Sequence, residues 1–227
     1  SKTDTGFKLT GSKPFVSDST LCDWLFLAFN CDGQLILAKV DKEQCQIHSE
    51  PTMDETKDMG RVTLDNLSIN KSDTMALSNE NLITLTNYGA VAVTAEMIGA
   101  AQSLLNLTSE YAKDRIQFGK PIGQYQGVKH RLAEMFVDIE SFRSLCYYAA
   151  WALDDAPAEV DRAVSLAKGY ASDAFVEIGI DGVGLHGAIG FTAEYDAQLY
   201  LKRSKWARPM YGDSNYHLDR LATLGGL

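Results

Sequence analysis

The chain has 227 residues, of which 45% are hydrophobic and 22% are charged, and its formal net charge at pH 7 is −9. This length fits one domain or two small ones with an ordinary packed core. The acidic balance argues against nucleic acid and against an anionic membrane surface as partners. No apolar run reaches the ~18 residues that a bilayer span needs, and residues 1–9 contain no signal-peptide core. We therefore expect a cytoplasmic location and no membrane partner.

The four cysteines form no CxxC pair: Cys22, Cys31, Cys45 and Cys146. In a cytosolic protein this spacing is typical of reduced thiols that pack as small apolar residues. We therefore expect neither a metal site nor a disulfide.

The first ~80 residues show the alternation of strands. Two apolar runs, 23–30 and 34–40, flank Cys31-Asp32-Gly33, which predicts a hairpin. Residues 61–69 alternate with one slip near Asn66, which indicates a bulge. Residues 43–59 are polar and irregular. Residues 1–78 are expected to form a small, partial antiparallel β domain.

From about Leu77 the apolar residues take up helical spacing. Three long stripes run through residues 98–112, 128–149 and 160–178, and a fourth helix is expected from Thr192 to Trp206. A short last helix is expected over residues 215–224. Long helices with short links indicate an antiparallel bundle. The predicted fold is therefore α+β, with an antiparallel four-helix bundle over residues 79–227.

The first of two glycine-rich breaks runs from Arg115 to Gly123. A guanidinium at a helix end can hold a phosphate through two parallel hydrogen bonds, and Gln117 offers both a donor and an acceptor. Gly119 permits a tight turn. The alternative is a helix C-cap whose arginine complements the helix dipole.

The second break is Gly182-Val183-Gly184-Leu185-His186-Gly187-Ala188-Ile189-Gly190-Phe191-Thr192. Its small residues let a ligand approach the backbone closely, and Thr192 is suited to cap the next helix. The alternative is a flexible corner in which His186 is a packing or surface residue. The break is not a GxGxxG after a strand, so a doubly wound nucleotide fold has no support.

The sequence around these breaks resembles the acyl-CoA dehydrogenase family. RIQFGKPIGQYQGVKHRLAEM is similar to the family signature RxxFGxxIxxxQxxxxxLAxM, and LHGAIGFTAEYDAQLYLKRSK is similar to HGGxGF…LYLKRAK. LTGSKPFVSDSTLCDWLFLAF resembles a segment of the family's β domain. The tail MYGDSNYHLDRLATLGG resembles bacterial members with a GDxxxH tail that form two-component dehydrogenases. The family's N-terminal helical domain has no counterpart in this sequence.

The resemblance implies an FAD-dependent oxidoreductase of lipid metabolism, such as fatty acid β-oxidation. Such enzymes convert an acyl-CoA to its 2,3-enoyl-CoA and pass the electrons to an electron-transfer flavoprotein. It also implies homo- or heterotetramers packed through the helical bundle. For FAD binding it implies Arg115, Gln117, Phe118, Phe15, Ser17, His186, Gly187 and Gly190. Gly184 and Ala188 depart from the pattern, because relatives carry glutamine and glycine there.

The resemblance also implies that the usual catalytic base is missing. Tyr211 stands where relatives have the catalytic glutamate, and Gly89 stands where other relatives place it. A phenol, with an ordinary pKa of about 10, is a poor base. Asp213 is the nearest carboxylate, and its alternative role is to cap the last helix. The catalytic residue therefore stays open.

Two hypotheses follow from this pattern. The chain is an acyl-CoA dehydrogenase, as a subunit or a fragment, or it is a non-catalytic assembly partner in a hetero-oligomeric dehydrogenase. The sequence determines neither the acyl chain nor the source of the base. It also does not determine whether this chain alone retains FAD.

Overall fold

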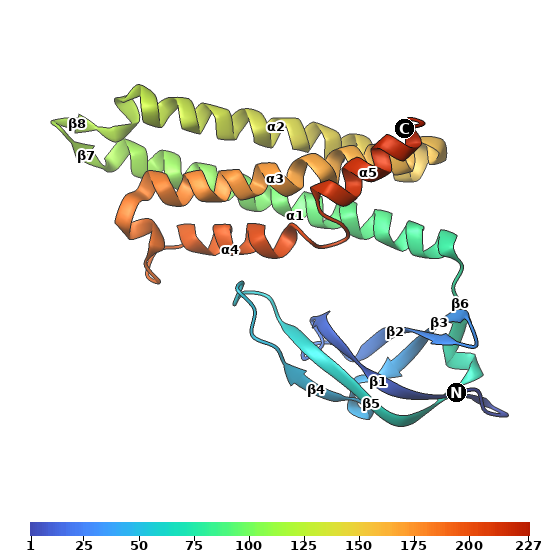
Figure 1. Cartoon of the computed structure of the whole chain (residues 1–227). Helices are drawn as coiled ribbons and strands as arrows, with labels where there is room; N and C mark the ends of the chain where they lie inside the picture. Colours follow the sequence, from blue (N-terminus) through green and yellow to red (C-terminus); the bar gives the residue numbers. More distant parts are fainter. The chain divides into compact units, whose positions relative to one another are not determined.

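The computed structural model describes residues 1–227 and contains two compact units, Ser1–Thr84 and Leu85–Leu227. The first unit is built of strands and the second of helices, as Figure 1 shows. The division falls within helix α1, Asn79–Asp114. The predicted boundary after residue 78 lies just before this helix begins.

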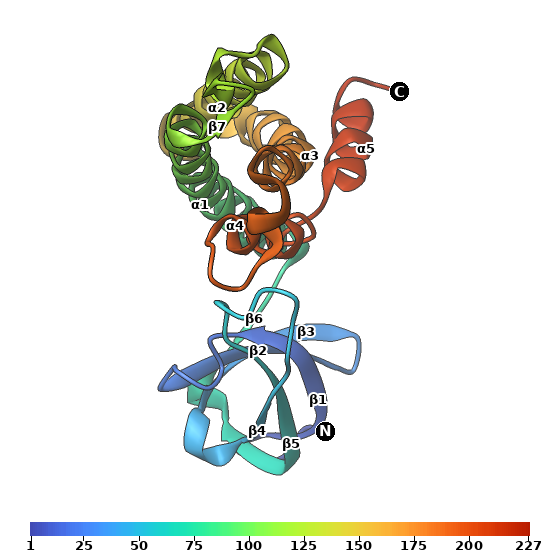
Figure 2. The same ribbon diagram turned by 90° about the vertical axis from the view of Figure 1, so that its left-hand side faces the viewer.

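The first unit consists of two three-stranded antiparallel sheets. One sheet has the order β1-β5-β4 and the other β2-β3-β6. The strands are β1 Gly6–Ser17, β2 Trp24–Cys31, β3 Gln34–Asp41, β4 Gln46–Ser49, β5 Met59–Asn70 and β6 Thr74–Ala76. Buried side chains from both sheets form one core, including Phe7, Leu25, Val40 and Val62. Figure 2 shows β2 and β3 on one side of this unit and β4 and β5 on the other.

The turn signals of the sequence are confirmed. Strands β2 and β3 are joined by Asp32 and Gly33, whose φ angles are 55° and 80°. The register of β1 against β5 shifts opposite Asn66, which has φ 52° and whose N–H donates to Thr10 Oγ1. The irregular segment predicted at residues 43–59 is partly wrong, because Gln46–Ser49 pairs with β5 as an edge strand.

The second unit contains three long helices and two short ones. They are α1 Asn79–Asp114, α2 Gln126–Asp155, α3 Val160–His186, α4 Ala197–Ala207 and α5 Ser214–Leu224. Both the strands and the bundle agree with the predicted α+β class. Figure 1 shows α1, α2 and α3 running side by side.

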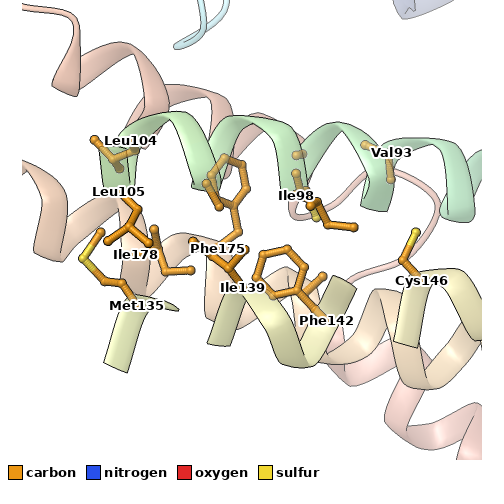
Figure 3. Packing of buried hydrophobic residues seen from close by; sticks show 14 of the residues in the cluster. Val93, Ile98, Leu104, Leu105, Met135, Ile139, Phe142, Cys146, Phe175 and Ile178 are labelled. Atoms are coloured by element: carbon orange, nitrogen blue, oxygen red, sulfur yellow. The ribbon is translucent and has the colours of Figure 1, made fainter. Parts of the chain in front are cut away.

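The bundle core is formed by the apolar stripes that the sequence predicts. Figure 3 shows Met135, Ile139 and Phe142 of α2 facing Phe175 and Ile178 of α3, with side chains from α1 beside them. Small residues bring the helices close together. A Cβ at Gly182 would lie 2.6 Å from Leu104 Cδ2, so α1 and α3 could not keep this packing with a larger residue at position 182.

Two predictions about the helical unit need correction. Thr192 does not cap α4: residues Gly187–Phe191 form a 3₁₀-helix (η5), and the Thr192 hydroxyl donates back to Ile189 O. Helix α4 begins only at Ala197.

All four cysteines are free thiols in this structure. The expectation that no apolar run is long enough for a bilayer span is not met, because α1 and the segment Pro157–Phe191 are long and apolar enough to cross a membrane by length and composition alone. Both contribute buried residues to the bundle core, and this role accounts for their apolar character.

Candidate functional site

The two glycine-rich breaks lie at the same end of the bundle. The first break joins α1 to α2 and the second joins α3 to α4, and Figure 1 shows both at that end. The Tyr111 hydroxyl on α1 donates to His186 O at the end of α3, at 3.3 Å. Residues far apart in the sequence therefore form one surface.

The first break is a tight hairpin. Strands β7 (Ile116–Gln117) and β8 (Lys120–Pro121) pair across Phe118 and Gly119, whose φ angles are 51° and 82°. The Tyr125 hydroxyl donates to Gln117 O at 3.0 Å and stabilises the hairpin. The Phe118 side chain is 94% exposed, so this apolar ring projects from the end of the bundle.

Arg115 is held by its backbone and not by its side chain. Its N–H donates to Tyr111 O at 2.8 Å, and its carbonyl accepts from Ile122 N at 2.9 Å. The guanidinium makes no hydrogen bond or ion pair within the chain and the residue is exposed. All N–H donors of the guanidinium are therefore available to an anion.

The second break is organised around a buried imidazole. His186 is 3% exposed, and its Nδ1–H donates to Gly182 O at 2.6 Å. Its ring lies between Tyr111 and Tyr195, with centroid distances of 4.5 Å and 4.8 Å. Burial lowers the pKa of His186, so the ring is neutral at pH 7. Its Nε2 is buried without a partner. The His186 ring thus fills the interior of the break after α3, between the two tyrosine rings.

The glycines of this break have different roles. Gly187 has φ 66° and open space around it, so its backbone is exposed to a ligand and a side chain there would be strained. At Gly190, a Cβ would lie 2.6 Å from Val183 O, so the chain's own packing requires glycine. Gly184 and Ala188 are exposed.

Phe15 and Ser17 belong to the β unit. Phe15 is 60% exposed with φ 53°, and its N–H donates to Glu50 Oε2. The Ser17 hydroxyl donates to Met59 Sδ at 3.4 Å. Their part in a common site with the bundle stays a prediction.

The two positions considered for a catalytic carboxylate lie against one another. A Cβ at Gly89 would lie 2.2 Å from Tyr211 Cε1, so the tyrosine ring occupies the space that a side chain on α1 would need. These residues are on α1 and on the turn before α5, far apart in the sequence. This place therefore holds a phenol and no carboxylate.

Asp213 does not replace that carboxylate in this structure. Its side chain accepts a hydrogen bond from Tyr216 N at 3.0 Å and caps α5. The capping alternative drawn from the sequence is therefore what the structure shows.

The turn that carries Tyr211 is held by two buried polar side chains. The Lys168 ammonium donates to Arg208 O and Gly212 O, at 2.9 Å and 2.8 Å. His217 Nε2–H donates to Tyr211 O at 3.1 Å. Tyr211 itself has φ 57°, an unusual value for a tyrosine. Sequence reasoning missed both Lys168 and His217; a lysine within the small-residue stripe of α3 was the only signal.

We expect Gly89→Ala to destabilise the protein by about 1–3 kcal/mol, because the new methyl group displaces the Tyr211 ring. Gly99→Ala is the matched control on the same helix, since nothing lies within 4 Å of a Cβ there. It should stabilise by roughly 0.5–1 kcal/mol through helix propensity. Denaturant unfolding of both variants, and of Gly89→Ala combined with Tyr211→Ala, measures the contact. Equal stabilisation by both alanines would show that the ring does not lie on Gly89.

Comparison with known proteins identifies the family. The profile of the acyl-CoA dehydrogenase C-terminal domain matches residues 80–224, which is more than half of the chain. This chain belongs to the acyl-CoA dehydrogenase family. It is 34% identical over 172 residues to acyl-CoA dehydrogenase IpdE2 of Mycolicibacterium smegmatis, covering 76% of this chain and 50% of that protein. The chain thus spans about half the length of this relative.

Solved structures share the fold over the whole chain. Butyryl-CoA dehydrogenase from Megasphaera elsdenii superposes with a TM-score of 0.90 at 22% identity, covering 100% of this chain and 62% of that one. The ChsE4-ChsE5 complex from Mycobacterium tuberculosis gives 0.89 at 23% identity, covering 99% and 61%. Members of the family are FAD-dependent flavoproteins.

The residues of the two glycine-rich breaks fit FAD. The unpaired Arg115 guanidinium suits a diphosphate, and the open backbone at Gly187 permits close approach of a large flat ligand. The side-chain oxygen Oε1 of Gln117 stays available to a ligand, because the side-chain amide uses only its Nε2, which donates to Ile116 O. The assignment of individual residues to FAD remains a prediction.

Proposed function

We propose that this chain forms the flavin-binding and acyl-binding part of an enzyme that removes the α and β hydrogens of an acyl-CoA thioester. Arg115 and the open backbone at Gly187 would hold FAD, which would supply the acceptor for the β hydrogen as a hydride, with an electron-transfer flavoprotein as the final electron acceptor. The chain's own contribution is to hold the diphosphate, exclude water from the acyl chain and orient the thioester.

One observation carries the proposal: two breaks about 60 residues apart in the sequence form one surface with an unpaired guanidinium and an accessible glycine backbone. The structural alternative is that Arg115 only complements the dipole at the C-terminal end of α1. The hairpin of Phe118 projects from the bundle end, and this exposure supports the proposal that Arg115 reaches a diphosphate held by a neighbouring protomer. Cofactor binding then requires a homo- or hetero-oligomer packed through the bundle.

A second candidate function is a non-catalytic partner subunit in a hetero-oligomeric dehydrogenase. The contact between Tyr211 and Gly89 favours it, since the two positions together provide a phenol and no carboxylate. In this case another chain supplies the carboxylate. A flavin-containing preparation whose visible absorbance bleaches with acyl-CoA supports catalysis by this chain, and a colourless one supports the partner function.

Arg115→Ala tests the proposed cofactor contact. A charge-assisted hydrogen bond contributes about 1.5–3 kcal/mol, so we expect FAD to dissociate roughly 10- to 150-fold more readily. The melting temperature should change little, because the side chain has no partner within the chain. Flavin retention is measured by fluorescence of the filtrate after dilution of the purified oligomer.

Arg162→Ala is the matched control, because Arg162 is an exposed arginine paired only with Glu159 on its own helix face. It should leave flavin retention unchanged. Loss of stability and of flavin in equal measure in Arg115→Ala would instead favour the helix-capping role of Arg115.

A further inference from the structure

Lys168 is the most deeply buried charged residue of the bundle. It is 0% exposed on α3, in a stripe of small residues. Its ammonium has three acceptors: Ser172 Oγ at 2.6 Å, Arg208 O at 2.9 Å and Gly212 O at 2.8 Å. An ammonium offers three donors, so its hydrogen bonds are fully satisfied.

Burying this amine is costly. Desolvation lowers the pKa of Lys168 to about 8, although Asp213 and Asp173 counteract the shift. An apolar side chain would fill the same place in the core without this cost. The hydrogen bonds therefore indicate what the lysine does: two of the three go to backbone carbonyls of one short turn, on either side of Tyr211.

That turn has a backbone that does not form readily by itself. Tyr211 and Gly212 have φ angles of 57° and 99°. A Cβ at Gly212 would lie 2.3 Å from the Tyr216 ring, so the turn is also tightly packed. Residues in such conformations persist where surrounding contacts fix them. Lys168 fixes the carbonyls of positions 208 and 212, and His217 fixes the carbonyl of position 211.

We infer that Lys168 is a positioning residue that holds the side chain of residue 211 over Gly89. In this position the side chain of residue 211 contacts the acyl-CoA thioester. The inference rests on the proposed function, because that function makes the space around Gly89 part of the acyl site. Lys168 itself does not touch the substrate: it is fully buried, and its donors are all used by the chain.

The test compares Lys168→Met with the unchanged protein in its flavin-loaded form. Methionine has a similar length and no donors, so the turn loses its two carbonyl contacts. The affinity for a non-reactive thioether analogue of acyl-CoA should fall about tenfold or more. Hydrogen exchange in residues 208–213 should become faster, while exchange in α1 and α2 stays the same.

A coupling measurement separates positioning from a general loss of structure. In a Tyr211→Ala background the side chain to be positioned is gone, so Lys168→Met should weaken analogue binding by less than about twofold. An equal loss in both backgrounds overturns the inference. Ser172→Ala removes only the hydroxyl acceptor, and it should accelerate exchange in the same turn to a smaller extent if Lys168→Met does not fold.

Binding of the analogue to the unchanged protein and to Lys168→Met separates the role of Lys168 from the proposed function. If the unchanged protein does not bind the analogue, the acyl site itself is wrong. If it binds the analogue and Lys168→Met binds equally well with unchanged exchange in residues 208–213, only the role of Lys168 is wrong.

Discussion

Tyr211→Glu is expected to raise the rate of α-proton removal from an acyl-CoA by about 100- to 10,000-fold, the usual contribution of a positioned general base. The position is held by hydrogen bonds to the backbone and not to the phenol, so the substitution leaves the turn intact. Gly89 has no side chain to compete for the space. The rate is measured by exchange of the α hydrogen with deuterated water, which does not require complete turnover.

Tyr211→Gln is the matched control, because it has the same shape as glutamate and cannot accept the proton. It should exchange no faster than the unchanged protein. Equal exchange in the two variants would mean that residue 211 does not reach the α carbon. If the unchanged protein already exchanges rapidly and Asp213→Asn abolishes this, the capping carboxylate is the base after all.

Local signals in the sequence were sufficient for much of the fold. Asp32-Gly33 between two apolar runs determines a hairpin because its left-handed turn matches the strand twist. The helical stripe of α2 is regular because Met135, Ile139 and Phe142 all face one core. Strand β4 was missed, because an edge strand with exposed Gln46 and His48 needs no apolar alternation.

Predictions from single residues failed where two signals competed. Thr192 is a good capping residue, but the chain before it continues as a 3₁₀-helix and uses its hydroxyl for Ile189 O.

The site was partly accessible to the same reasoning. Both breaks and the lack of a carboxylate at positions 89 and 211 could be predicted from the residues and from family resemblance. That the ring of Tyr211 lies on Gly89 could not, because no local pattern relates residues so distant in the sequence. The buried Lys168 is a similar case, since its acceptors are backbone carbonyls, which the sequence does not distinguish.

His217 is expected to make the protein sensitive to acid. It is fully buried, and desolvation together with the charge of Lys168 lowers its pKa to about 4. Arg220 lowers the pKa further, while Asp213 opposes the shift. Between pH 6.5 and 4 an unfolded chain protonates this histidine and the folded chain does not. The unfolded state then binds more protons, so the free energy of unfolding falls as the pH falls.

The shift of the His217 pKa from 6.5 to about 4 corresponds to a loss of about 3 kcal/mol in the free energy of unfolding over this pH range. Urea unfolding at a series of pH values measures this loss.

His217→Gln should be less stable at pH 7 but should lose less stability on acidification, because glutamine does not titrate. His130→Gln, at an exposed position, should retain the full loss. Parallel curves for His217→Gln and the unchanged protein would show that protonation of this ring does not oppose folding.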